Sequence, residues 1–159
     1  MLPLYFEGDN SVMNFDMIEI YQRHLGNMGD FTSLIELKRV MIKHYIQQKT
    51  PDHKLRRSYV EILCCQIILG DIYKLQETVD RFSFDCGGNP YAFDEYDIAV
   101  KVKEAVENND PDSLLDLSKK PLFGFLDSNV VKRIKRWALD QPRQDAQPAS
   151  SATGGFDLT

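Results

Sequence analysis

The stretch that decides the fold runs from residue 50 to residue 82 and reads TPDHKLRRSYVEILCCQIILGDIYKLQETVDRF. Thr50 followed by Pro51 is typical of a helix start, because threonine caps the first turn and proline lacks an N–H that this turn leaves unpaired anyway. Apolar residues then recur at helical spacing as far as Gly70, a typical helix end. Asp71 is expected to cap a second helix. The apolar stripe of that helix is Ile72, Leu75, Val79 and Phe82.

The rest of the chain follows the same pattern. Ser11 is expected to cap a helix that ends at Gly26, and a second helix follows Asp30 with two apolar stripes, which implies two neighbours. Further helices are predicted over residues 93–106, over 111–117 after Asp110, and from Asp127 to residue 137. No segment shows the alternation of a β-strand.

The turns repeat along the sequence. Gly29-Asp30, Gly70-Asp71 and Asn109-Asp110 follow one another at intervals of 41 and 39 residues, and each joins two predicted helices. Helical hairpins of roughly this length are typical of TPR-like or HEAT-like solenoids. The sequence therefore predicts an all-α fold of TPR-like antiparallel helix-hairpin repeats that form a short right-handed superhelix. This repeat domain is expected over residues 1–139, followed by a disordered tail over 140–159 that ends in an apolar tip, Phe156-Asp157-Leu158-Thr159.

Composition narrows the class of protein. The 159 residues are 43% hydrophobic, enough for one domain with a substantial core, and the net charge of −5 argues against a nucleic-acid binder. No apolar run approaches the ~20 residues that span a bilayer, and no signal peptide is visible at Met1. Cys64, Cys65 and Cys86 lack the spacing of a disulfide framework, so we expect reduced thiols in the cytosol.

Motifs for catalysis are missing from the sequence. His24, His44 and His53 fall on different predicted helices without zinc-ligand spacing, and no nucleophile elbow or phosphate-binding glycine loop occurs. We therefore expect no enzymatic activity, cofactor, metal or small-molecule substrate. A catalytic site assembled from distant residues stays open as an alternative.

Charge is segregated along the chain. Seven Lys and Arg residues between positions 38 and 57 are opposed only by Asp52, whereas residues 80–116 are mainly acidic. The electrostatic field of such a segregated charge distribution attracts partners of opposite charge and disfavours binding to surfaces of like charge. The last predicted helix carries a further basic face beside Trp137, and its apolar face is expected to pack on the preceding helices.

Several segments, in the same order, resemble a known family. They are Tyr59 to Leu63 continuing through Gly70-Asp71 to Phe82, then Asn108-Asn109-Asp110, then Pro121-Leu122-Phe123-Gly124-Phe125-Leu126-Asp127, and finally Leu158 as the penultimate residue. Together they resemble the C-terminal half of the gamma-type SNAPs (soluble NSF attachment proteins). The resemblance covers residues 30–139 and the tip. Members of that family are longer, and their N-terminal half, with its membrane-touching loop, is not recognisable here.

The resemblance implies an adaptor that wraps a SNARE helical bundle and presents its C-terminal end to the NSF ATPase, in the cytoplasm and peripheral to membranes through its partners. It implies that basic residues grip the acidic bundle, and that an acidic face with the apolar tip Leu158 engages the ATPase. The basic set is Lys38, Arg39, Lys43, Lys54, Arg56 and Arg57. The ATPase-facing set is Glu104, Glu107, Asp110, Asp112, Asp157 and Leu158. The alternative is a TPR-like scaffold subunit of another multiprotein complex.

Overall fold

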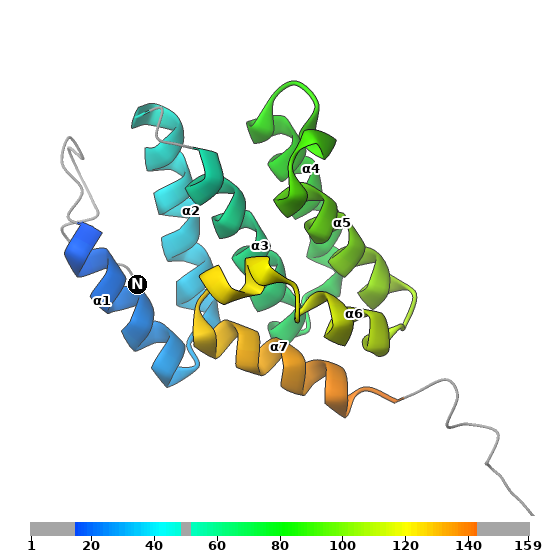
Figure 1. Cartoon of the computed structure of the whole chain (residues 1–159). Helices are drawn as coiled ribbons and strands as arrows, with labels where there is room; N and C mark the ends of the chain where they lie inside the picture. The colour runs from blue at the N-terminus through cyan, green and yellow to red at the C-terminus, as the bar shows by residue number, and fades with distance from the viewer. Residues whose placement is uncertain (1–14, 49–51, 143–159) are drawn as a thin grey trace, which may run out of the picture.

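A computed structural model describes residues 15–48 and 52–142, and within these ranges the chain is all-helical, as predicted. Seven α-helices pack together (Figure 1). They are α1 (Phe15–Met28), α2 (Phe31–Gln48), α3 (Asp52–Leu69), α4 (Leu75–Cys86), α5 (Asp94–Glu107), α6 (Pro111–Leu117) and α7 (Ser128–Asp140). Short 3₁₀ helices lie between them: η2 (Ile72–Lys74), η3 (Pro90–Ala92) and η4 (Pro121–Phe125). The predicted start at Ser11, the Thr50-Pro51 cap and residues 143–159 of the predicted tail lie outside the described residues.

The three repeated turns share one backbone geometry. Gly29, Gly70 and Asn109 all have positive φ, at 73°, 82° and 54°. The next residue in each turn donates its N–H to a carbonyl five positions earlier: Asp30 to Leu25 (3.0 Å), Asp71 to Gln66 (2.9 Å) and Asp110 to Ala105 (2.8 Å). This is the Schellman ending, in which a left-handed residue lets the chain leave one helix and start the next. The repeated sequence signal therefore corresponds to a repeated local structure.

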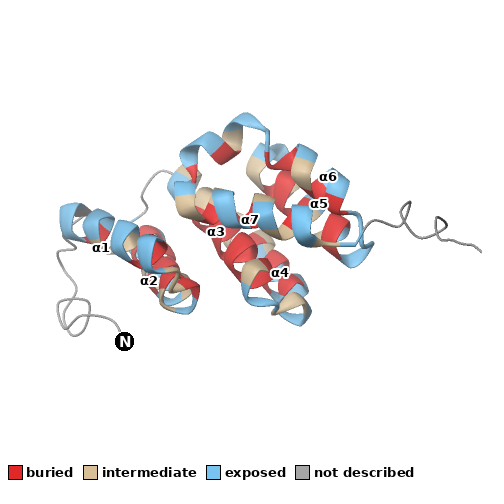
Figure 2. Cartoon of the chain, turned by 90° about the horizontal axis from the view of Figure 1, so that it is seen from below, coloured by how far each residue is buried: buried red, intermediate tan, exposed pale blue. Residues whose placement is uncertain are grey.

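Helix α3 lies at the centre of the molecule. It contacts α2, α4, α5 and α7, and every residue from Ser58 to Ile67 is buried (Figure 2). A helix that is covered on all sides must be apolar around its circumference, or must pair the polar groups that it buries. Cys64 and Cys65 lie here as fully buried free thiols and form part of the core.

Of the three polar residues within this buried stretch, Ser58 donates its hydroxyl to the Lys54 carbonyl of the same helix (2.9 Å), and Glu61 and Gln66 are paired across helices. Gln66 accepts a hydrogen bond from the Thr78 hydroxyl of α4 (2.9 Å). Glu61 forms an ion pair with Lys38 of α2 and also accepts the backbone N–H of Asp127. The buried Glu61 carboxylate thus joins α2, α3 and the start of α7.

Helix α7 runs across the ends of the earlier helices and contacts α3, α6 and α1 (Figure 1). Asp127 caps it, as predicted, by accepting the N–H groups of Asn129 (2.8 Å) and Val130 (3.3 Å). Val130, Ile134 and Ala138 form its buried stripe. The docking of its apolar face is therefore confirmed. Lys132 and Arg136 are exposed, whereas the Arg133 guanidinium lies over the Phe31 ring of α2, 5.1 Å from the centroid.

Three details differ from the predicted pattern. Helix α1 does not end at Gly26 but continues to Met28, and the left-handed residue that ends it is Gly29. Asp71 makes no side-chain cap, and η2 precedes α4, which begins only at Leu75. The segment from Pro121 to Phe125 forms η4, which buries Phe123 and leaves Phe125 exposed. Short 3₁₀ turns depend on how the chain enters the core, so helical periodicity alone does not reveal them. Within the described ranges, no helix has the length and apolarity needed to cross a membrane.

A candidate protein-binding groove

A groove of about 400 Å³ lies between α2, α3 and α4. Arg39 and Lys43, two of the predicted partner-binding residues, lie one turn apart on the α2 wall. Arg81 stands on the α4 wall. The apolar lining consists of Val40, Ile42, Ile46 and Ile62. Ile46 is 48% exposed, so an apolar side chain sits beside the cations at the groove surface.

The α3–α4 side of the groove is fixed by aromatic packing. The Tyr59 ring stacks on Phe82, with centroids 4.9 Å apart, and Phe82 meets the edge of Tyr96 at 5.2 Å. The Tyr59 hydroxyl donates to the carboxylate of Asp85. Burial is the main cause that raises the pKa of Tyr59, and the hydrogen bond to Asp85 raises it further, so the phenol stays neutral. Tyr59 and Asp85 therefore act as a fixed, internally satisfied part of the lining.

The charge of the groove is unbalanced. Arg39, Lys43 and Arg81 are exposed, and none of the three forms an ion pair with another described residue. Asp85 is the one acid in the lining, and it already accepts the Tyr59 hydroxyl. Three cations over an apolar floor attract an acidic surface that also carries apolar groups.

The remaining members of the basic set lie elsewhere. Lys38 is 6% exposed and paired with Glu61, so it is not available to a partner. Arg56 donates to Glu95 of α5 (2.8 Å) and covers the Phe93 ring at 4.1 Å, which makes it part of the α3–α5 contact. Lys54 and Arg57 line a separate cleft against α1. The structure therefore brings together Arg39 and Lys43 and places the other four residues outside the groove.

The predicted acidic set lies at the α5–α6 end of the molecule. Glu104 and Asp110 line a shallow mixed-charge hollow with Lys101 and Lys120. Glu107 pairs with Lys103 at 2.8 Å, and Asp112 is exposed. Asp110 caps α6 by accepting both the hydroxyl and the N–H of Ser113, which lowers the pKa of its carboxyl. Asp157 and Leu158 lie outside the described residues.

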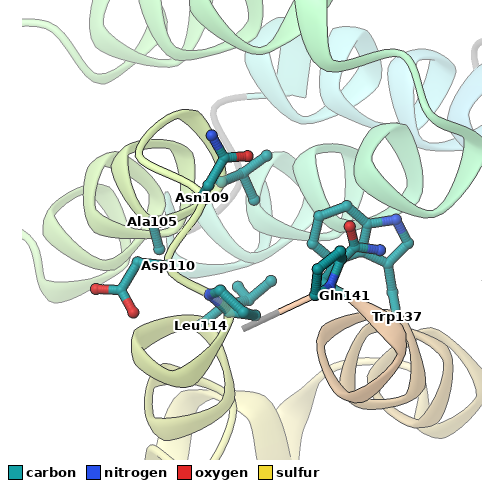
Figure 3. A pocket seen from close by; sticks show the side chains of 9 residues that line it. Ala105, Asn109, Asp110, Leu114, Trp137 and Gln141 are labelled. Atoms are coloured by element: carbon teal, nitrogen blue, oxygen red, sulfur yellow. The ribbon is translucent and has the colours of Figure 1, made fainter. Parts of the chain in front are cut away.

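A further pocket, of about 220 Å³, lies between the α5–α6 turn and the end of α7 (Figure 3). Ala105, Leu114 and the Trp137 indole form much of its wall, and Asp110, the helix cap, is its one titratable residue. This lining pairs no nucleophile with a base. Among the described residues, no three His, Cys, Asp or Glu side chains come together as a metal site.

Sequence reasoning missed Arg81, because it lies in the segment assigned to the acidic block. Arg81 lines the same groove as Arg39 and Lys43 only because α4 folds back against α3. The separation of these residues along the sequence does not indicate that they come together. No family model matches the sequence, and no curated protein or solved structure is significantly similar to it. Function is therefore argued from the geometry and from the sequence resemblance.

Proposed function

We propose that this chain is a non-enzymatic, protein-binding adaptor whose basic groove holds an acidic, apolar-bearing surface of a partner. The observation that supports the proposal is the set of three exposed cations, Arg39, Lys43 and Arg81, which lack an acidic partner among the described residues and surround an apolar floor. Attraction between opposite charges orients such a partner, and burial of Ile46 would add affinity.

The resemblance to gamma-type SNAPs supplies candidate partners. In this proposal the hairpins form a TPR-like superhelix, the groove grips an assembled SNARE bundle, and the acidic α5–α6 end with the tip Leu158 recruits an NSF-type ATPase. The protein would act in vesicle-mediated transport in the cytoplasm, and it would associate with membranes through its partners. The alternative is a TPR-like scaffold of another complex, which would use the same groove for a different acidic partner.

The test is capture of an assembled SNARE bundle by the immobilised chain at low and moderate salt. The test variant is Arg39→Glu with Lys43→Glu. The matched control is Lys132→Glu with Arg136→Glu, which reverses two exposed charges at the same four-residue spacing on α7. We expect the groove variant to lose at least about tenfold in affinity and the control to bind as the parent does, because direct charge contacts are screened less than distant ones.

Addition of NSF distinguishes the two versions of the proposal. A SNAP-type adaptor lacking residues 156–159 should keep SNARE binding and lose stimulation of ATP hydrolysis. A scaffold of another complex should capture neither SNAREs nor NSF. Bundle capture that is independent of salt and unchanged in the groove variant would refute the role of the groove.

A further inference from the structure

A second cleft lies on the opposite side of α2 from the groove. Its volume is about 470 Å³, and its walls come from α1, α2, α3 and the η4 segment. The α2 residues that line it are Lys38, Met41 and Tyr45, whereas Arg39, Lys43 and Ile46 line the groove. The two cavities therefore use different faces of the same helix and can be occupied independently.

Two buried polar atoms in this cleft have no hydrogen-bond partner among the described residues. They are Oε1 of Gln22, an acceptor on α1, and Nε of Arg57, a donor on α3. Both side chains line the cleft. A buried donor without an acceptor and a buried acceptor without a donor are each unfavourable, and native proteins keep few of them. Their presence in one cleft points to a ligand that supplies an acceptor and a donor together.

Arg57 is covered by a weakly held ring. Its guanidinium lies over the Phe125 ring of η4, 4.2 Å from the centroid. Phe125 is 65% exposed, so the ring has few other contacts that keep it there. A single cation–π contact at an exposed site is weak. The ring can therefore swing away at little cost and uncover one face of the Arg57 guanidinium.

The charge of the lining favours an anion. Lys38 and Glu61 neutralise each other. The other charged residues in the lining are Arg23, Lys54 and Arg57 against Glu19 and Asp127. Cations thus outnumber acids in the part of the cleft that a ligand would contact.

We propose that this cleft binds an acidic residue within an extended peptide segment. The carboxylate pairs with the Nε edge of Arg57, where a guanidinium can form two parallel hydrogen bonds. The main-chain N–H of the same segment donates to Oε1 of Gln22. Because the cleft is separate from the groove, this site goes beyond the function proposed above, and it gives the chain a second peptide contact on its opposite face.

The experiment follows the Nε–H signal of Arg57 by NMR in the full ¹⁵N-labelled chain. The probe is the acetylated and amidated peptide Ala-Glu-Leu-Glu-Ala, and the control peptide carries Gln in place of both Glu residues. Binding of the acidic peptide should move the Arg57 Nε–H signal downfield and slow its exchange with water. The control peptide should bind at least about tenfold more weakly, because hydrogen bonds to charged groups are the stronger kind.

Variants separate binding from folding. Arg57→Lys keeps the positive charge and removes the pair of parallel N–H donors of the guanidinium. This variant should therefore lose most of its affinity for the peptide, while its thermal unfolding stays cooperative. Gln22→Leu should weaken binding several-fold, and Phe125→Ala should strengthen it about two- to fivefold, because the covering ring is gone. The groove variant Arg39→Glu with Lys43→Glu should leave this titration unchanged. An Arg57 signal that does not respond to the peptide, or equal affinity for both peptides, would overturn the proposal.

Discussion

Replacement of Glu61 should strongly destabilise the fold. Its side chain is 5% exposed and that of its partner Lys38 is 7% exposed, and the carboxylate also accepts the N–H of Asp127 at the start of α7. Glu61→Leu leaves a buried ammonium without a counter-charge. Removal of one member of a buried pair typically costs about 3–5 kcal/mol. For a chain of this size, that loss corresponds to a fall in Tm of roughly 6–20 °C.

The double variant makes the test specific. Lys38→Met combined with Glu61→Leu removes both charges and leaves only the Asp127 N–H without its acceptor, which costs about 1–3 kcal/mol. The double variant should therefore be more stable than either single variant. Urea unfolding of the four proteins gives the free energies and hence the coupling between the two sites. A double variant whose loss equals the sum of the two single losses would refute the reasoning, because the two charges would then not depend on each other.

Further predictions concern the thiols, high pH and the α7 cap. A thiol-reactive dye should modify Cys86 in the native protein and reach Cys64 and Cys65 only after denaturation, since these two are fully buried; rapid labelling of all three thiols would contradict this. Burial raises the pKa of Cys64 from 9.0 to about 12, so the unfolded chain releases this proton first, and the free energy of unfolding should fall as pH rises from about 9 towards 12. The buried phenol of Tyr59, whose pKa is also raised, adds to the same trend, and urea midpoints that stay constant above about pH 9 would contradict both assignments. Asp127→Ala removes the α7 cap and should cost about 1 kcal/mol, whereas a stability equal to that of the parent would show that the cap adds nothing.

The local parts of this fold could be predicted from sequence because their causes are local. Gly29, Gly70 and Asn109 adopt the left-handed conformation that the turns require, and Asp110 and Asp127 are followed by the N–H groups that they cap. These signals depend on residues within a few positions of one another. The helical fold class and most helix ends followed from them.

The site could be predicted only in part, because it depends on helix phase and on packing over long distances. Lys38 and Arg39 are neighbours in sequence, but successive residues on an α-helix point about 100° apart. One is therefore buried against Glu61 while the other faces the groove. A block of positive charge along the sequence could not show this division, nor could it show that Arg81 comes to lie beside Arg39.

The central claim is that the groove between α2 and α4 is where a partner binds. The most direct test is an amide chemical-shift map of the ¹⁵N-labelled chain, recorded while an assembled SNARE bundle is added at low salt. The account predicts that the largest changes fall on Arg39, Lys43, Ile46 and Arg81, and that they fade as salt is raised. Changes that are absent from these residues, or centred on another face while binding persists, would contradict it.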